Sequence, residues 1–326
     1  MIDEESYLFT SDGYKQAKEI SRGDLVLTHK NRLQMVDEIA FSIEPTFLIK
    51  GQGFPSFMAT ADQLLISREK NSNRLRHIPV CQLKPKINFV TRLINQREVN
   101  PLNITADEAF VLGRYVADGY ITFTGSHEKN NYYEFLRISI GDYRIDKFHS
   151  SIKHSTQHKK GTTTTIVSYF SKRLTDIAKT HCGRYSLHKG LTPTILNLPK
   201  DILRSFVRGY LSGDGCMMNG WCEYATVSDK LNLSLSSAIL KAYGVNVNMS
   251  YKIPAPLHTI EGRVVHQNPI FYCRFKEHPA KTSCIYTDTK LFSPIKAITE
   301  DKPKKVLWFK TQDNSLVVNN VLCYGN

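Results

Sequence analysis

Two short segments of the sequence each carry an aspartate directly behind an apolar stretch with small residues four positions apart. Residues 111–119 read VLGRYVADG and contain Asp118, and residues 207–215 read VRGYLSGDG and contain Asp214. Small residues at i and i+4 share one face of a helix, so two such helices can pack with their backbones in near contact. The two carboxylates would then lie side by side, and paired carboxylates are typical ligands of a catalytic divalent cation.

The spacing of the two segments indicates an internal repeat. The small residues are Gly113 and Ala117 in the first segment and Gly209 and Gly213 in the second, and corresponding glycines and aspartates are both 96 residues apart. A period near one hundred residues fits two structural repeats of one domain. We expect the final glycine of each segment to adopt the left-handed conformation that often ends a helix.

Together these features resemble the LAGLIDADG homing endonucleases, whose two signature helices pack at a pseudo-twofold axis and whose last acidic residues bind the metal ions that cut both DNA strands. The match covers the small residues, the aspartate and the final glycine of each segment. The acid at the sixth position of the family motif is replaced by Val116 and Ser212, but that position varies and is not the metal ligand. The resemblance implies two or three Mg²⁺ ions at a site made of Asp118, Asp214 and the backbone carbonyls of Ala117 and Gly213.

The reaction implied by the resemblance is cleavage of a long, specific double-stranded DNA site by a monomer, because one chain holds both half-sites. Hydrolysis of a phosphodiester needs an activated water and a stabilised leaving oxygen, and divalent ions provide both. Members of the family also keep a basic residue near the scissile phosphate in each half. By position in the sequence, we assign Lys252 to this role in the second repeat and Lys159 in the first.

The sequence around the two helices predicts two αββαββα repeats. Thr105 and Glu108 form a capping box, which sets the start of the first signature helix. In the first repeat we expect strands at 120–124, 134–140 and 159–169 and helices at 143–154 and 174–180. In the second repeat we expect strands at 223–228, 245–251 and 270–275 and a helix at 229–243. Two such sheets would form a concave saddle that fits a DNA groove.

The charge of the chain points to a polyanionic partner, with nucleic acid favoured over a membrane. The formal net charge is +13, and residues 103–280 hold 22 Lys and Arg against 14 Asp and Glu, a net charge of +8. Basic side chains in such a region bind phosphates, and those on strands can reach base edges. The candidate DNA-binding residues are Arg137, Lys160 and Arg274.

The two ends of the chain read as short strands and resemble the Hint fold of inteins. Strands expected at 7–10, 24–28 and 33–42 are separated by turn signals, and residues 59–65 (ATADQLL) resemble the intein block that normally reads Thr-x-x-His, with Thr60 at its first position. At the other end, strands expected at 293–298 and 306–309 precede DNSLVVNNVLCYGN, which is similar to the closing intein blocks. The resemblance implies a Hint domain interrupted by the endonuclease.

The residues that splicing needs are only partly present. Met1 offers no thiol or hydroxyl to accept the acyl group, and Gln63 replaces the histidine that protonates the leaving amide. Gly325 stands where the family has a penultimate histidine, whereas Asn326, whose side-chain amide attacks its own carbonyl, is retained. The sequence therefore predicts reduced, altered or absent splicing. If the chain is an intein, its flanking partners are the exteins of a host protein.

The expected fold is α+β, with an endonuclease inserted in an all-β domain. We place the Hint domain at 1–100 and 283–326, and the endonuclease at 101–282 with repeats at about 103–195 and 196–282. No apolar stretch is long enough to cross a bilayer, so no membrane is expected as a partner. The seven cysteines contain no C-x-x-C pair, which favours a reducing intracellular compartment, in the cytoplasm or nucleus wherever the target DNA is.

Three other functions are compatible with part of the pattern. A DNA- or RNA-binding maturase on the same scaffold would not cut, but the intact aspartates in both helices favour cleavage. A splicing-competent intein with a vestigial endonuclease conflicts with Met1, Gln63 and Gly325. A basic metabolic enzyme would need a phosphate-binding glycine loop or a nucleophile triad, and the sequence contains neither signal.

Overall fold

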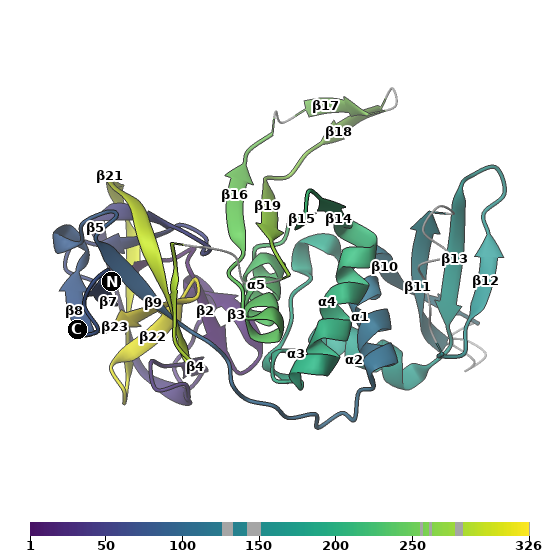
Figure 1. Ribbon diagram of the computed structural model, residues 1–326, viewed down its shortest axis with the longest axis horizontal. Helices are drawn as coiled ribbons and strands as arrows, with labels where there is room; N and C mark the ends of the chain where they lie inside the picture. The colour runs from purple at the N-terminus through teal and green to yellow at the C-terminus, as the bar shows by residue number, and fades with distance from the viewer. Residues whose placement is uncertain (126–132, 142–150, 255–256, 261–262, 278–282, 326) are drawn as a thin grey trace. The chain divides into compact units, whose positions relative to one another are not determined.

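The computed structural model describes the chain except for residues 126–132, 142–150, 255–256, 261–262, 278–282 and 326 (Figure 1). The described chain forms two compact units. The first comprises residues 1–96, 246–249 and 279–326, and the second comprises residues 97–245 and 250–278. The first unit thus ends at residue 96 and resumes at residue 279, close to the expected boundaries at 100 and 282. The structure also assigns a short segment, 246–249, to this unit.

The first unit is made of strands, thirteen of which form one strongly branched sheet. Short 3₁₀ turns at Ala17–Glu19 and Val80–Gln82 connect some of them. The strands are β1 (Ile2–Asp3), β2 (Tyr7–Thr10), β3 (Gly13–Gln16), β4 (Leu25–Leu27), β5 (Leu33–Gly51), β6 (Phe57–Thr60), β7 (Leu64–Glu69), β8 (Arg76–Pro79), β9 (Asn88–Leu93), β20 (Ile285–Tyr286), β21 (Lys290–Thr311), β22 (Ser315–Val318) and β23 (Val321–Tyr324).

Long strands join the two ends of the chain in this unit. β5 and β21 pair antiparallel over most of their length. The sequence predicted two strands within β21, at 293–298 and 306–309, and this was wrong. The polar segment between them contains Pro303, and the register shifts between Asp301 and Lys304, so a bulge bends the strand without ending it. The core beneath is aliphatic and aromatic and includes Leu8, Ile49 and Val318.

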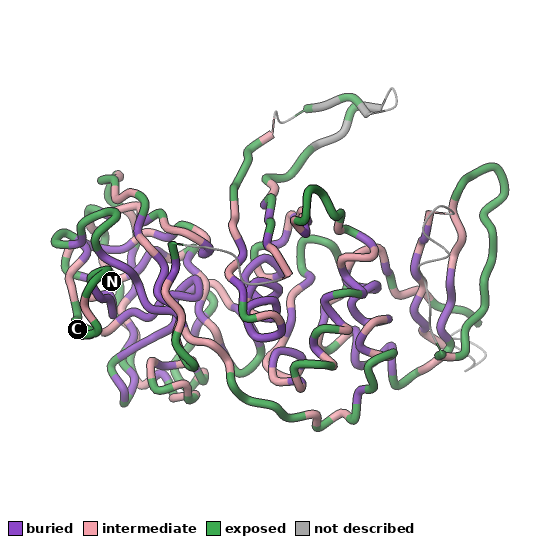
Figure 2. The backbone as a smooth tube through the Cα atoms, viewed as in Figure 1, coloured by how far each residue is buried: buried purple, intermediate pink, exposed green. Residues whose placement is uncertain are grey.

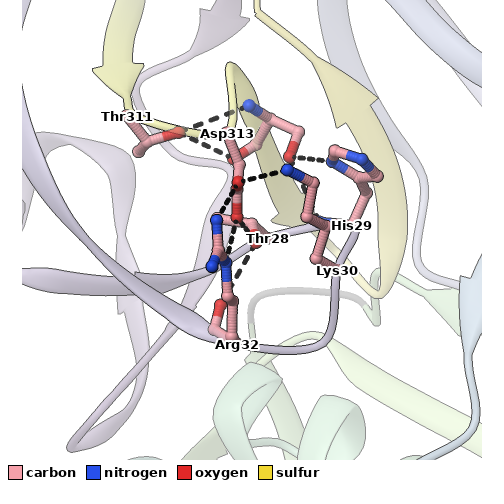
Figure 3. A network of polar contacts seen from close by, with 7 residues as sticks. Thr28, His29, Lys30, Arg32, Thr311 and Asp313 are labelled. Atoms are coloured by element: carbon pink, nitrogen blue, oxygen red, sulfur yellow. Dashed lines mark hydrogen bonds and ion pairs between the residues drawn. The ribbon is translucent and has the colours of Figure 1, made fainter.

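A buried carboxylate fastens a turn from the N-terminal part to a turn from the C-terminal part (Figure 3). The Asp313 side chain, 1% exposed, accepts hydrogen bonds from Thr28 Oγ1 at 2.7 Å and Arg32 Nε at 2.8 Å, and it pairs with Lys30 Nζ at 2.9 Å. The hydrogen bond from Arg32 is the largest of the effects that hold the pKa of Asp313 far below its usual range. The loop between β4 and β5 is thereby tied to the loop between β21 and β22.

The second unit contains two repeats, each with a four-stranded antiparallel sheet. The sheet orders are β10-β11-β13-β12 and β14-β15-β19-β16, and a separate hairpin, β17-β18, lies in sequence between β16 and β19. The elements are α1 (Ala106–Asp118), β10 (Gly119–Thr124), β11 (Tyr133–Gly141), β12 (Ser155–His158), β13 (Thr164–Tyr169), α2 (Lys172–His181), η4 (Ser186–His188), α3 (Pro193–Leu196), α4 (Lys200–Asp214), β14 (Gly215–Met218), β15 (Trp221–Thr226), α5 (Asp229–Tyr243), β16 (Asn248–Lys252), β17 (Leu257–Ile260), β18 (Arg263–His266) and β19 (Ile270–Phe275).

Several predicted elements of these repeats differ from the structure. The expected strand at 159–169 begins only at Thr164 (β13), because residues 159–163, with Gly161 at φ +75°, form the turn that joins β12 to β13. Most of the expected helix at 143–154 lies outside the described residues, and residues 151–154 are not helical. The second repeat lacks the expected last helix in the part that is described, since the chain passes from β19 to the first unit.

Local signals place the helices of this unit well. The predicted capping box is present at α1, where Thr105 Oγ1 accepts from the Glu108 amide at 3.2 Å and Glu108 Oε2 accepts from the Thr105 amide at 3.0 Å. α5 begins behind Ser228 and ends at Gly244 in the left-handed conformation. Figure 2 shows α5 largely buried, whereas the turn between β12 and β13 is exposed. None of the described helices is long and apolar enough to span a membrane.

Candidate active site

The two signature helices, α1 and α4, lie side by side in near backbone contact (Figure 1). A Cβ atom placed on Gly113 would lie 1.9 Å from the carbonyl oxygen of Phe206, and one placed on Gly209 would lie 2.0 Å from that of Phe110. No carbon atom can approach an oxygen so closely, so this crossing requires glycine on both helices. The packing predicted from the spacing of small residues is therefore confirmed.

The crossing brings the ends of the two helices together. A Cβ atom on Gly213 would lie 2.5 Å from the Ala117 Cβ and 2.7 Å from the Asp118 Oδ2, and Asp214 is the next residue along the chain. The Asp118 side chain is 33% exposed, and Asp214 is exposed. The structure thus places both predicted carboxylates at one accessible end of the helix pair.

The glycines behind these aspartates do not adopt the predicted left-handed conformation. Gly119 has φ −94° and Gly215 has φ −95°, which is extended backbone, because β10 and β14 begin directly at these residues. Glycine is nevertheless required by space. A Cβ atom would lie 2.6 Å from the Tyr115 Cα at the first position and 2.5 Å from the Leu211 carbonyl oxygen at the second.

A buried lysine that the sequence did not indicate, Lys189, caps the C-terminal end of α1. Lys189 is 5% exposed, and its Nζ donates to the carbonyls of Tyr115 (3.0 Å), Val116 (2.8 Å) and Gly119 (3.1 Å). Burial lowers the pKa of Lys189 to about 8, against the opposing attraction of Asp214 and Asp118. The same two carboxylates also act on the buried Tyr210, whose pKa is raised chiefly by burial.

The position of Lys189 follows from helix electrostatics. The last carbonyls of a helix carry partial negative charge, so an ammonium group is favourable there even where, as at Tyr115, the carbonyl already accepts from a backbone amide. Its backbone is fixed from α5, because Ser228 Oγ donates to the Lys189 carbonyl at 2.6 Å. No sequence signal marks this lysine: lysines are almost never fully buried, and the surrounding segment shows no periodicity.

A second buried cation, Arg114, lies inside the helix pair. It is 2% exposed, and its Nη2 lies 3.0 Å from Asp118 Oδ2 one helical turn further on. A Cβ atom on Gly213 would lie 2.6 Å from its Nη1, so the guanidinium occupies the interface itself. The corresponding residue of α4 is the neutral Tyr210, whose hydroxyl donates to the Ala225 carbonyl at 3.3 Å.

The two lysines assigned from the sequence lie elsewhere. Lys159 is exposed in the turn between β12 and β13, and by sheet register it is three strands and three residues away from Gly119, about 17 Å. Lys252 is exposed on β16, three strands away from Gly215, about 14 Å or more. A lysine side chain cannot cover these distances, so neither joins the aspartates. The error arose because the position along the chain was used without the strand order.

The predicted DNA-binding arginines point away from the helices. On β11 the neighbours of Arg137 in sequence are buried, whereas Arg137 is half-buried and donates from Nε to Ser168 Oγ at 3.3 Å. On β19, Arg274 is exposed and its guanidinium lies over the Trp221 ring at 5.1 Å. Lys160 is exposed in the turn between β12 and β13. All three side chains are therefore accessible to a ligand on the solvent side of their sheets.

The donor set at the helix ends suits a hard cation. Among the described residues, no group of three or more His, Cys, Asp or Glu side chains surrounds a single point. Mg²⁺ does not need one, since it is usually held by one or two carboxylates together with waters and substrate phosphates. Asp118 and Asp214 match that pattern, and the peptide units of Ala117 and Gly213 directly precede them in the chain. All seven cysteines are free thiols.

The first unit holds a second cluster, at the residues predicted for splicing. The amino group of Met1 donates to Thr60 Oγ1 at 2.8 Å, and the Thr60 amide donates to the Met1 carbonyl at 3.0 Å. Gln63 Nε2 donates to the Tyr324 carbonyl at 2.7 Å, and Gly325 lines one small cavity with Gln63. The first and last described residues therefore meet on either side of one turn. Asn326 lies outside the described residues.

Comparison with known proteins gives matches to solved structures alone. No protein-family model matches the chain, and no curated protein does. The gp41-1 intein is similar at 17% identity and a TM-score of 0.24, over 28% of this chain and 66% of that one. The MchDnaB-1 intein is similar at 15% identity and a TM-score of 0.24, over 27% of this chain and 65% of that one. The chain thus spans just under two thirds of the inteins it matches.

The homing endonuclease I-DmoI, solved in complex with DNA and Mn, is similar at 15% identity and a TM-score of 0.35. That match covers 53% of this chain and 90% of that one. Solved structures similar to this chain therefore include both kinds of protein that its sequence motifs resemble. At TM-scores below 0.5 these similarities carry no functional weight, so function has to be inferred from the site itself.

Proposed function

We propose that this chain is a site-specific double-stranded DNA endonuclease inserted in a Hint-type splicing domain. The observation that carries the proposal is the convergence of Asp118 and Asp214 at one accessible end of a helix pair whose crossing requires glycine on both sides. Two carboxylates delivered by two equivalent repeats suit a substrate with two equivalent bonds to break. Duplex DNA, with its two antiparallel strands, is such a substrate.

In the proposed reaction the protein binds the metal ions, orients the phosphodiester and neutralises its developing charge. Asp118 and Asp214, with the carbonyls of Ala117 and Gly213, would hold Mg²⁺, which supplies a nucleophilic hydroxide and stabilises the leaving oxygen. Lys189 takes the role that we had assigned to Lys159 and Lys252, because its ammonium group caps the end of α1, next to Asp118, and the charges of both aspartates act on it. The positive charge held there offsets the charge that develops on the phosphate.

The DNA would lie across the solvent side of the two sheets of the second unit. Arg137 and Arg274 are accessible there, and Lys160 extends the basic surface along the turn of the hairpin. Phosphate contacts from such residues bind DNA independently of sequence, and side chains that reach base edges select the target. The net charge of +8 over residues 103–280 favours the same partner. Because both repeats belong to one chain, we propose a monomer, acting inside the cell where its target DNA is.

For the first unit we propose splicing that is reduced, altered or absent. Its two chain ends meet at Thr60 and Gln63, which is the arrangement an intein needs, with extein segments of a host protein as the flanking partners. The residues for the splicing reaction are incomplete, because the Met1 side chain has no nucleophile and the Gln63 amide can donate a hydrogen bond but not a proton. The function of the chain thus lies in its second unit.

The test is selection followed by cleavage. Duplexes bound by the protein would be enriched from a randomised pool, and the enriched sequence would be placed in a supercoiled plasmid with Mg²⁺. We expect cuts in both strands at one position by the unaltered chain. The Asp118→Asn/Asp214→Asn double variant should still bind the sequence and leave both strands intact.

The matched control is Asp176→Asn, which removes an exposed acid from α2 without touching the helix pair. It should cut like the unaltered chain. Specific binding with no metal-dependent cutting by the unaltered chain would exclude the endonuclease and favour the maturase. Cutting that persists in the double variant would place the active site elsewhere.

A further inference from the structure

The buried guanidinium of Arg114 has no use in the proposed reaction as described so far. It lies within the interface between α1 and α4, 2% exposed, with its Nη2 3.0 Å from Asp118 Oδ2. Arginine stays charged in proteins, so a permanent positive charge sits at the end of the helix pair. An ordinary packing residue would be apolar here, as are the buried neighbours Leu112 and Val116.

This charge is placed where it opposes a divalent ion. A cation bound by Asp118 would lie within a few ångströms of the Arg114 guanidinium, since both interact with the same carboxylate. Like charges at such distances repel strongly in a partly buried site. Oδ2 of Asp118 would also have to serve both the guanidinium and the metal, or leave the metal to Oδ1.

We propose that Arg114 is a built-in counter-cation that weakens divalent metal binding at Asp118. It occupies Oδ2 when no metal is present and so keeps the two carboxylates from repelling one another across the helix crossing. The inference rests on the proposed function for the identity of the ligand. It goes beyond that function by assigning to Arg114 a control of metal affinity that no motif of the sequence indicates.

The two halves of the site are then unequal. The residue that corresponds to Arg114 in α4 is Tyr210, a neutral side chain whose pKa is raised by burial, so it stays uncharged. The second helix therefore brings no guanidinium of its own to Asp214. Removing the charge at position 114 should strengthen metal binding through Asp118 and leave the contribution of Asp214 in place.

The experiment measures Mn²⁺ binding to the full chain by titration calorimetry, without DNA. Three substitutions of Arg114 serve: Arg114→Met removes the charge and keeps the length, Arg114→Gln removes the charge and keeps a polar head, and Arg114→Lys keeps the charge. We expect both neutral variants to bind Mn²⁺ at least about tenfold more tightly, and Arg114→Lys to stay near the unaltered chain. If Arg114→Met does not fold by circular dichroism, Arg114→Gln carries the comparison.

A second series repeats the substitutions in the Asp118→Asn background, where the gain should disappear because the shared carboxylate is gone. Unchanged or weaker Mn²⁺ binding in both neutral Arg114 variants would overturn the role of Arg114. The proposed metal site would still stand in that case if the Asp118→Asn/Asp214→Asn variant loses Mn²⁺ binding. If neither the unaltered chain nor the variants bind Mn²⁺, the metal site fails and the role of Arg114 fails with it. A merely structural Arg114 would change the unfolding midpoint and not the metal affinity.

Discussion

Replacement of Gly113 by alanine tests the helix crossing on which the active site depends. The new methyl group would lie 1.9 Å from the Phe206 carbonyl oxygen, and since a carbon and an oxygen need about 3.2 Å, the helices would have to separate by roughly 1.3 Å. Overpacking of this kind costs about 1–3 kcal/mol, or more where backbone atoms must move. In an isolated helix the same change stabilises by about 1 kcal/mol. We therefore expect a net loss of up to about 2 kcal/mol in the free energy of unfolding.

The same displacement acts on function, because the crossing lies just over one helical turn before Asp118. A shift of about 1 Å in a reacting group can cost about 100-fold in rate. The assays are chemical denaturation of the full chain and cleavage of the selected duplex. Gly161→Ala is the control: it has nothing within 4 Å, so it should cost up to about 1 kcal/mol for its positive φ and leave cleavage unchanged. A Gly113→Ala variant that is more stable than the unaltered chain would refute the close crossing.

Three further predictions concern buried charges. Lys189→Met should lower the cleavage rate by about 100-fold or more while DNA binding in a filter assay is kept, and an unchanged rate would remove Lys189 from the reaction. Asp313→Asn should lower the free energy of unfolding by about 2 kcal/mol at pH 7. Because the pKa of Asp313 is lowered in the folded state, the difference in stability between the variant and the unaltered chain should shrink as the pH falls below about 4. A stability difference that stays constant with pH would contradict the ion-pair account. Lys241, buried and donating to the Leu196 carbonyl at 2.9 Å, has its pKa lowered by burial from 10.5 to about 8. The unfolded chain thus binds more protons between these values, so the unaltered chain should gain stability over Lys241→Met as the pH rises from 8 to 10 in urea denaturation, and a loss over that range would show the sign to be wrong.

The parts of the site that the sequence reveals are those set by local backbone geometry. Small residues four apart determine how closely two helices approach, so Gly113 and Gly209 could be placed at a crossing without a structure. The capping box at Thr105 likewise depends on residues three apart. The paired aspartates follow from the crossing, because Asp118 and Asp214 each lie five residues beyond the glycine at which the two helices touch.

The parts that the sequence hides depend on contacts between distant residues. Lys159 and Lys252 were placed by counting residues, whereas their distance from the aspartates is set by strand order. Lys189 reaches the end of α1 from a segment without periodicity, and its burial is offset by carbonyl groups that no side-chain pattern encodes. Similarly, β21 was divided in two because a proline and charged residues end most strands, while here a bulge absorbs them.

Strand register exposes a difference between the repeats that their shared motif conceals. In the first sheet Gly119 pairs with Ile138, which pairs with Val167; in the second, Gly215 pairs with Tyr224, which pairs with Cys273. These triplets define equivalent positions, since each begins directly behind a signature aspartate. One step further along, each sheet carries another row of paired side chains.

The charges in these equivalent rows are not the same. Arg137 on the second strand of the first sheet corresponds to Glu223, and Ser168 on the third strand corresponds to Arg274. The arginine thus moves by one strand, about 4.8 Å, which on duplex DNA is roughly one base pair. If the chain is the proposed endonuclease, its two half-sites are read at different positions and its target is not a palindrome. Arg137→Ala and Arg274→Ala should therefore relax selection at base pairs with different offsets from the cut, measured on singly substituted duplexes. Equal offsets, or tightest binding to a perfect palindrome, would show that these arginines do not read the sequence.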